Sequence, residues 1–451
     1  MTAEDVRARV RALMPQARSE LAELVGIRSV ADPRQFPPEE CARAARWVLD
    51  AFAGLGFEDV ALHETPDGSR AVVGSRPAAV PGAPTVLLYA HYDVQPPLDD
   101  AAWRTPPFEL TEVDGRWYGR GAADCKGNVV MLLTALRALG DDVPVNLRLV
   151  VEGSEEQGTG GLEQFVPGHA DLLRADAILV CDTGNAAVGE PAVTVSLRGM
   201  VNVVVDVVAL PSELHSGMFG GPAPDALAAL VSVLASLRDD KGDTTVVGLD
   251  RSQTWTGAPY DPEAFRRDAG VTPEESLLGS GTVSDMLWAR PALTVLGVDC
   301  PPVVGSSAAI VPRASARLNL RIPPGTHPDE AETALTDHLR RAAPWGVEVA
   351  VRTESKGAPF RAGTDGPAHA AVAAAMKEAY GRDVVRLGQG GSIPLCTVFA
   401  ETYPDAELIL MGVEEPLALI HAPNESVDPR EIERLATATA LFLQRYAGVR
   451  R

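Results

Sequence analysis

The sequence predicts an α/β fold, in which a larger domain with a mixed, mostly parallel sheet flanked by helices carries an inserted α+β two-layer domain. A chain of 451 residues is too long for one ordinary hydrophobic core. Apolar runs at 85–90, 145–151 and 176–180 are typical of buried strands, and helical stretches separate them. From about Ser196 the pattern changes to that of a smaller α+β unit.

The first part of the chain alternates helices with strands. A second helix is expected to begin at Pro37-Pro38 and to end at Gly54, because Pro favours helix starts and Gly favours helix ends. The expected elements are helices at 3–25 and 37–53, strands at 60–64, 71–74 and 85–90, a helix from about Asn128, and strands at 145–151 and 176–180.

The middle of the chain has the order strand, helix, strand, strand, helix, strand, which is typical of a small two-layer α+β domain. The expected elements are strands at 200–208, 293–297, 308–311, 314–322 and 347–351 and helices at 225–237 and 329–343, with a loop-rich stretch at 239–290. The α/β pattern then returns, with a helix at 367–380, a strand at 407–411 and a last helix from Asp428-Pro429. We therefore expect domain boundaries of 1–195, 196–358 and 359–451.

Composition excludes some classes of partner. A net charge of −21 argues against nucleic acid, because phosphate binding needs clustered Lys and Arg. No apolar run approaches the roughly 18 residues of a membrane span, and the N-terminus lacks the apolar segment of a signal peptide. The five cysteines form no Cys-x-x-Cys pair and favour reduced thiols. We expect a cytoplasmic protein without a nucleic-acid or membrane partner.

Candidate metal ligands gather at the ends of the predicted strands. His91, Asp182 and the pair Glu155-Glu156 each follow an apolar run, and His421 is expected just past the buried strand at 407–411. Two adjacent carboxylates repel each other unless a cation stabilises them. Considered without the other residues, the pair also fits a solvated acidic turn, and each histidine also fits a structural role. With Asp124 the set has two imidazoles and three ligand carboxylates, enough for two zinc-like ions that share one carboxylate.

The motifs resemble the co-catalytic (dinuclear zinc) metallopeptidases, the family of carnosinase-type dipeptidases, aminoacylase, glutamate carboxypeptidase and succinyl-diaminopimelate desuccinylase. The resemblance is greatest to the carnosinase-like dipeptidase branch. It departs at Cys125, where that branch commonly has an acid. The matching pieces, in the order of the family, are His91-x-Asp93, Gly119-Arg120-Gly121-Ala122-Ala123-Asp124-Cys125-Lys126-Gly127, Glu152-Gly153-Ser154-Glu155-Glu156, Asp182, Leu214-His215-Ser216-Gly217 and His421-x-Pro423-x-Glu425.

The resemblance implies two divalent metal ions per subunit, zinc first, with manganese or cobalt as alternatives. Asp124 would bridge the two ions, His91 and Asp182 would complete one site, and His421 and Glu156 the other. Asp93 would orient the imidazole of His91 through its second nitrogen. Glu155 would be the general base and acid, taking a proton from a hydroxide-forming water between the two metals and passing it to the leaving amine.

The resemblance also assigns roles within the inserted domain, which it identifies as a lid/dimerisation domain of a homodimer, beside the catalytic domain. His215 would reach the active site of the partner subunit and stabilise the oxyanion. Arg321 would bind the terminal carboxylate of the substrate, with Arg313 and Arg198 as competing candidates. Outside the inserted domain, in the last part of the chain, the loop at Gly391 and Ser392 would bind the same carboxylate.

Asp182 favours hydrolysis of dipeptides or short peptides with a free N-terminus, because the carboxypeptidase and N-deacylase branches tend to have Glu at this position. An N-acyl amino acid amidohydrolase or a carboxypeptidase on the same scaffold is the alternative. A binding protein that has lost catalysis is a third reading, and Glu155 argues against it, since a binding site needs no base.

Overall fold

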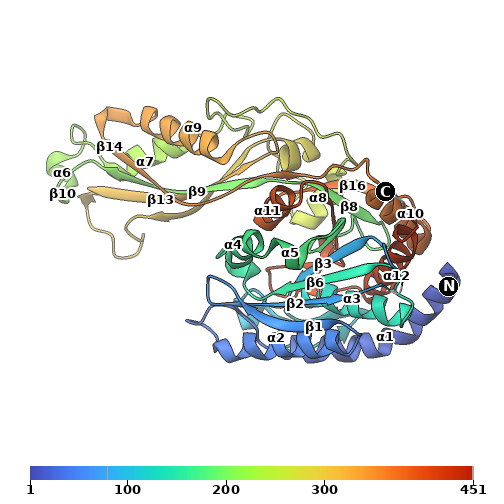
Figure 1. Ribbon diagram of the computed structural model, residues 1–451. Helices are drawn as coiled ribbons and strands as arrows, with labels where there is room; N and C mark the ends of the chain where they lie inside the picture. Colours follow the sequence, from blue (N-terminus) through green and yellow to red (C-terminus); the bar gives the residue numbers. More distant parts are fainter. Residues whose placement is uncertain (79, 449–451) are drawn as a thin grey trace. The chain divides into compact units, whose positions relative to one another are not determined.

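The computed structural model describes residues 1–78 and 80–448 and divides them into two compact units (Figure 1). Unit 1 comprises residues 1–195, 362–387 and the described part of 395–451, and unit 2 comprises residues 196–361 and 388–394. The Gly-rich loop at 388–394 therefore belongs to unit 2, although it lies far along the chain from the rest of that unit.

The largest sheet runs in the order β1-β2-β6-β3-β7-β17-β8, and the short strands β15 and β16 both pair with β8. Parallel pairing joins the central strands β6, β3, β7 and β17, whereas β1, β2 and β8 pair antiparallel. The bounds are β1 (Glu58–Glu64), β2 (Arg70–Arg76), β3 (Thr85–His91), β6 (Asn146–Glu152), β7 (Ala177–Cys181), β8 (Ala192–Leu197), β15 (Phe360–Arg361), β16 (Val385–Gln389) and β17 (Glu407–Met411).

The parallel register brings the carboxyl ends of the central strands to one edge of the sheet. His91 at the end of β3 lies beside Glu152 of β6, and Met411 of β17 lies beside Cys181 of β7. Side chains that follow these strands are therefore neighbours in space, although they lie far apart in sequence.

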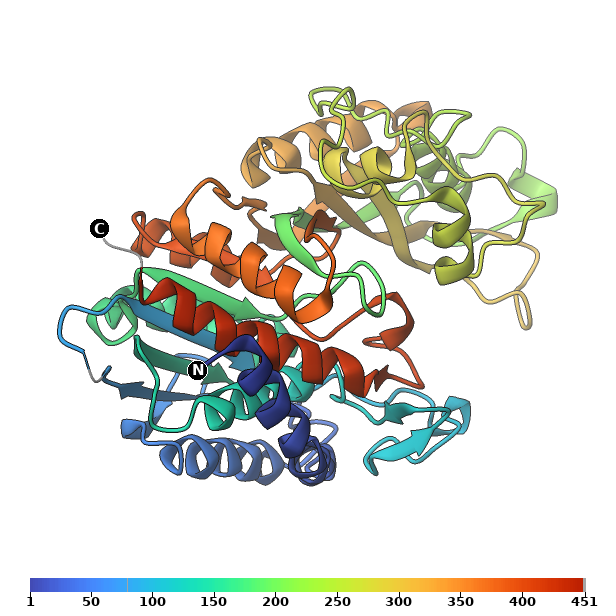
Figure 2. The ribbon, with the colours of Figure 1, turned by 90° about the vertical axis from the view of Figure 1, so that its right-hand side faces the viewer.

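Helices cover both faces of this sheet. On one face α1, α2, α3, α10 and α12 share a continuous core with the strands, and Figure 2 shows α1, α10 and α12 side by side. On the other face, Phe399 of α11 packs edge-on against Tyr89 of β3 with ring centroids 6.3 Å apart. The bounds are α1 (Ala3–Val25), α2 (Pro38–Ala53), α3 (Lys126–Leu139), α4 (Gly161–Gly168), α5 (Ala170–Leu173), α10 (Pro367–Tyr380), α11 (Pro394–Thr402) and α12 (Pro429–Tyr446).

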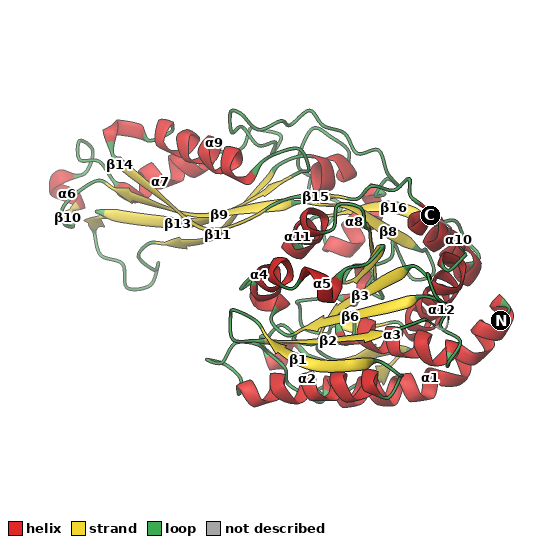
Figure 3. Cartoon of the chain, viewed as in Figure 1, coloured by secondary structure: helices red, strands yellow, loops and turns green. Residues whose placement is uncertain are grey.

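Unit 2 is a two-layer α+β structure, with α7 and α9 packed on an antiparallel sheet of order β11-β13-β9-β14 (Figure 3). Valines alternate along β9 and point their buried side chains at these helices, as the period of a strand requires. The bounds are β9 (Gly199–Val208), β10 (Leu214–His215), α6 (Ser216–Phe219), α7 (Ala226–Ala235), α8 (Pro262–Ala269), β11 (Ala292–Asp299), β12 (Ala309–Ile310), β13 (Arg313–Ile322), α9 (Pro328–Arg341) and β14 (Glu348–Gly357).

The predicted fold class is confirmed, with a mixed sheet flanked by helices and a separate α+β unit. The stretch 239–290, expected to be rich in loops, contains α8 and a π-helical turn, Asp285–Ala289. Strand β14 extends beyond the predicted 347–351, because exposed residues alternate along it and weaken its apolar pattern. A small sheet of β4 (Thr111–Val113), β5 (Arg116–Tyr118) and β18 (Ser426–Val427) was not expected. Among the described residues, no helix is both long and apolar enough to span a membrane.

Candidate active site

Unit 1 brings together the two imidazoles and the three carboxylates that the sequence suggested as metal ligands. His91 is the last residue of β3, Asp182 follows β7, and Glu156 lies in a 3-10 turn after β6. Asp124 lies in the loop before α3. His421 does not directly follow a strand as expected; it lies in a turn after the short helix Pro416–Ala418, in the left-handed backbone region with φ of 62°.

Asp124 lies between the two imidazoles and presents one oxygen to each. Its Oδ1 is 3.0 Å from His91 Nε2, and its Oδ2 is 2.9 Å from His421 Nε2. The same nitrogen of His91 is 3.1 Å from Asp182 Oδ1, and that of His421 is 3.1 Å from Glu156 Oε2. The five residues thus form two groups of one nitrogen and two oxygens, joined by Asp124.

This arrangement fits a pair of divalent ions. Ligand atoms about 2.0–2.1 Å from a tetrahedral zinc ion lie about 3.3 Å apart, close to the nitrogen–oxygen separations in both groups. Cys125 also lies near His91 and Asp182, but its thiol donates to the backbone oxygen of Cys181 and burial raises its pKa to about 12. The ligand atoms are therefore imidazole nitrogens and carboxylate oxygens, which zinc, manganese and cobalt all accept.

The electrostatics of the group also favour cations. Burial, together with the charge of Asp124, raises the pKa of Glu156 to about 7, and burial raises the pKa of Glu155 well above its usual value. Burial lowers the pKa of His421, but hydrogen bonds to Asp124 and Glu156 outweigh it and raise that pKa to about 11. Several carboxylates compete for few positive charges, and dications would remove this repulsion.

Asp93 contacts both His91 and the turn that carries the adjacent glutamates. Its backbone oxygen lies 3.1 Å and its carboxylate 3.3 Å from His91 Nδ1. Its two carboxylate oxygens accept the backbone N–H groups of Glu155 and Glu156 at 3.2 and 3.0 Å. The expected contact with the second imidazole nitrogen is present, and the contact with the turn is an addition that the sequence did not suggest.

Glu155 is held by its backbone and not by its side chain. Among the described residues its carboxylate has no hydrogen-bond or ion-pair partner, whereas that of Glu156 contacts His421 and accepts from the side chain of Gln95 at 2.8 Å. The two neighbours thus differ in their contacts, since the carboxylate of Glu156 contacts the histidine group and that of Glu155 does not.

Glu425 fixes the loop that carries Asp124. Its carboxylate pairs with Arg120 at 2.7 Å, and it accepts the backbone N–H groups of Gly121, Ala123 and Asp124 at 3.0 to 3.1 Å. Both charged side chains are buried, at 1% and 0% exposure. The sequence placed Glu425 within a motif without a role, and the structure gives it this one.

Glu414 is a further buried carboxylate in this group that sequence reasoning missed. One of its oxygens lies within 4.8 Å of oxygens of Asp124 and Asp182. It follows β17 by three residues, as Asp182 follows β7 by one. The signal was present in the sequence, since an apolar strand with an acid shortly after it is the pattern that identified Asp182.

The remaining predicted site residues lie in unit 2. His215 is exposed at the start of α6, where its Nδ1 accepts the N–H of Gly217 at 3.1 Å. Arg321 is half-buried in β13 and donates to Asn319 at 3.1 Å. Gly391 and Ser392 lie in the loop 388–394, and the hydroxyl of Ser392 is buried without a partner among the described residues.

Arg198, one of the competing candidates, is buried in the same unit without an acidic partner. Its backbone pairs with Gln389, and its Nε and Nη1 atoms have no hydrogen-bond acceptor among the described residues. Burial, followed by the charge of Arg321, lowers its pKa to about 10. Two arginines near each other without a carboxylate indicate a place for an anion. Arg313, the other candidate, is exposed at the start of β13.

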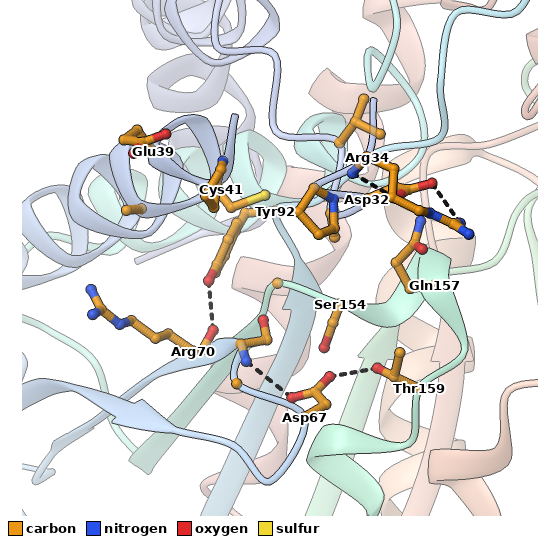
Figure 4. A pocket seen from close by; sticks show the side chains of 18 residues that line it. Asp32, Arg34, Glu39, Cys41, Asp67, Arg70, Tyr92, Ser154, Gln157 and Thr159 are labelled. Carbon is orange, nitrogen blue, oxygen red and sulfur yellow. Dashed lines mark hydrogen bonds and ion pairs between the residues drawn. The ribbon is translucent and has the colours of Figure 1, made fainter. Parts of the chain in front are cut away.

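A cavity of about 620 Å³ is lined by residues next to the turn that carries the glutamates (Figure 4). Ser154 and Gln157 line it, whereas Glu155 and Glu156 between them do not. Two of its polar side chains are paired: Tyr92 donates to the backbone oxygen of Arg70 at 2.6 Å, and Arg34 donates to Asp32 at 2.9 Å. None of the five candidate metal ligands is among the residues that line this cavity.

Comparison with known proteins agrees with this geometry. Residues 87–445 match the sequence profile of Peptidase family M20/M25/M40. The chain is 42% identical over 435 residues to the cysteinylglycine-S-conjugate dipeptidase of Corynebacterium striatum, which is 95% of this chain and 94% of that protein. It is 29% identical over 442 residues to the Beta-Ala-His dipeptidase of Homo sapiens, covering 90% of this chain and 85% of that one. The crystal structure of human carnosine dipeptidase 1 superimposes with a TM-score of 0.84 at 26% identity and covers 99% of both chains. The resemblance seen in the motifs is thereby confirmed, and the chain belongs to peptidase family M20/M25/M40.

Proposed function

We propose that the protein is a metal-dependent dipeptidase, which hydrolyses the peptide bond of dipeptides or short peptides with a free N-terminus. The observation that carries the proposal is Asp124, whose two oxygens face the two different imidazoles and so suit a bridge between two ions. The dipeptidases among its relatives support the substrate class. His91 and Asp182 would hold one ion, and His421 and Glu156 the other.

The residues of the chain have separate tasks in this reaction. Two bound ions would supply Lewis acidity toward the scissile carbonyl and lower the pKa of a water molecule. Glu155 takes a proton from the attacking water on its carboxylate and gives it to the nitrogen of the leaving amine. Asp93 keeps Glu155 in place through the backbone of the turn, so that the base stays beside the two groups of ligands.

The substrate carboxylate is proposed to bind in unit 2, to Arg321 together with Gly391 and Ser392. The buried hydroxyl of Ser392 and the buried guanidinium of Arg198, both without partners, support an anion site there. An anion between two arginines would satisfy donors that are otherwise costly to bury.

A homodimer through unit 2, the proposed lid/dimerisation domain, is part of the same proposal. Strand β11 is an edge strand, and its side chains Val295, Leu296 and Val298 are 42%, 52% and 44% exposed. An exposed apolar edge strand is a surface that a second copy would cover. In such a dimer His215 would act in the active site of the partner.

The dimer proposal is tested by mixing two inactive variants, His215→Ala and Glu155→Gln. Exchange of subunits should restore part of the activity, because one mixed site would then contain both intact residues. Proven subunit exchange without recovery would place His215 outside the neighbouring site.

The function itself is tested with a panel of dipeptides, N-acetyl amino acids and N-succinyl amino acids, with zinc or manganese supplied. We expect hydrolysis of the dipeptides and its loss in Glu155→Gln. Hydrolysis of only the acylated compounds would indicate an N-acyl amino acid amidohydrolase instead, and full turnover by Glu155→Gln would reject the role of the base.

Zinc as the native ion and a cytoplasmic location belong to this proposal as well. The ligand atoms suit zinc, with manganese and cobalt as alternatives. The five cysteines are all free, as is usual in a reducing compartment. Elemental analysis of the purified protein and fractionation of the cells that produce it test these two points.

A further inference from the structure

Glu414 is held beside the two groups of ligands by its backbone. Its carbonyl oxygen accepts the N–H of Asn185 at 2.8 Å, and the N–H of the preceding Val413 donates to Asn128 of α3 at 2.9 Å. Gly184 makes this approach possible, because a Cβ atom there would lie 2.5 Å from the carbonyl oxygen of Glu414. The turn after β17 is thus fastened to the turn after β7 that carries Asp182.

The side chain of Glu414 makes no hydrogen bond or ion pair within the described part of the chain. It is 6% exposed, and its Oε1 atom is buried without a hydrogen bond among the described residues. One of its oxygens lies within 4.8 Å of oxygens of Asp124 and Asp182. A buried carboxylate without donors is costly, and two more carboxylates beside it add repulsion. A cation among the three oxygens would offset both the burial of this carboxylate and the repulsion.

We propose that Glu414 is a further ligand of the ion held by His91 and Asp182. This inference rests on the proposed pair of ions and adds to it. The first ion would then have four protein ligands, His91, Asp124, Asp182 and Glu414, whereas the second would have three, with a position left for substrate. A closed set of four ligands typically retains its metal, and a set of three leaves the ion open to react. The two ions should therefore differ in affinity, the first being the tighter.

The test is a titration of the chelator-treated full chain with Co²⁺ alone. Calorimetry measures the affinity of each site, and visible absorption reports which ligands surround the Co²⁺ ion. We expect wild type to bind one ion more tightly than the other. Glu414→Gln should weaken the tight site by about 10- to 100-fold, as other changes in metal environments do, and change its spectrum, with the weaker site little affected. Glu414→Asp, which keeps the charge but withdraws the carboxylate, should weaken the same site.

The matched control is Glu415→Gln, because Glu415 is an adjacent buried carboxylate that faces Arg116. It should bind Co²⁺ as wild type does and unfold at a lower temperature. The melting temperature of metal-free Glu414→Gln should be no lower than that of metal-free wild type, because the variant loses a buried charge that has no partner. A lower melting temperature together with unaltered Co²⁺ binding would mean that Glu414 has a structural role, and would overturn the inference. Two unaltered Co²⁺ affinities in Glu414→Gln would also overturn it, while leaving the proposed function intact. A wild-type chain that binds no Co²⁺ would overturn both.

Discussion

Asp93 and Glu155 are joined by a hydrogen bond across 62 residues of sequence, with the Oδ1 atom of Asp93 accepting the backbone N–H of Glu155 at 3.2 Å. The same carboxylate accepts the N–H of Glu156 and lies beside His91 Nδ1. One side chain therefore fixes both a proposed metal ligand and the turn that carries the proposed base.

Replacing Asp93 with Asn should weaken both metal binding and turnover. Asn keeps the size of the side chain, but one of its two terminal groups is a donor and cannot accept a backbone N–H. Loss of such orienting contacts typically costs about 10- to 100-fold in metal affinity or activity. Metal titration and steady-state kinetics measure the effect.

Asp225→Asn is the control, because Asp225 also accepts two backbone N–H groups, at the start of α7 in unit 2, where Asn caps a helix equally well. Equal metal affinity of Asp93→Asn and Asp225→Asn would show that Asp93 does not orient the site.

Glu425→Gln should destabilise the fold of unit 1. The change leaves the guanidinium of Arg120 buried without its counter-ion, and breaking a buried ion pair on one side costs about 3–5 kcal/mol. Thermal unfolding with and without metal measures it. The double variant with Arg120→Met should recover part of the loss, because no unpaired charge remains. A loss below about 1 kcal/mol in Glu425→Gln would contradict the importance of this pair.

After a chelator has removed the metal, the stability of the protein should fall as the pH rises. The pKa of Glu156 is raised by burial from 4.5 to about 7 in the folded protein, so the folded state binds more protons than the unfolded state between these values. Hydrogen bonds to Asp124 and Glu156 raise the pKa of His421 from 6.5 to about 11 against the effect of burial, and the stability it contributes is lost as the pH rises through this range. Both groups act in the same direction.

Melting temperatures between pH 5 and 9, with and without metal, test this dependence. The increase caused by metal should grow with pH, because protons compete with metal for the same carboxylates and imidazoles. A metal-free protein that becomes more stable over this range would contradict the proposed environment.

Arg321→Ala should impair hydrolysis of dipeptides with a free carboxylate more than of the corresponding dipeptide amides. Hydrogen bonds to charged groups contribute about 1.5–3 kcal/mol, so kcat/KM for the free acids should fall by about 10- to 150-fold. Arg313→Ala is the matched control, since Arg313 is exposed on the same strand. An equal loss for acids and amides would show that Arg321 does not bind the carboxylate.

The sequence pointed to those candidate ligands that follow strongly apolar strands. His91 and Asp182 were found because β3 and β7 are continuous apolar runs, each buried along nearly its whole length. Glu414 was missed because two residues separate it from β17, and contacts that the sequence does not reveal, such as the close approach to Gly184, hold it beside the candidate ligands. The second task of Asp93 could not be predicted either, since it depends on the pairing of β3 with β6.

The metal content of wild type and of Asp124→Ala, measured by elemental analysis after dialysis in metal-free buffer, tests the proposed centre most directly. With one oxygen on each imidazole, Asp124 should serve both ions. Wild type should retain about two ions per chain, and Asp124→Ala should lose both or hold them far more weakly, since a shared ligand is removed. An Asp124→Ala protein that still retains two ions would contradict a centre bridged by this carboxylate.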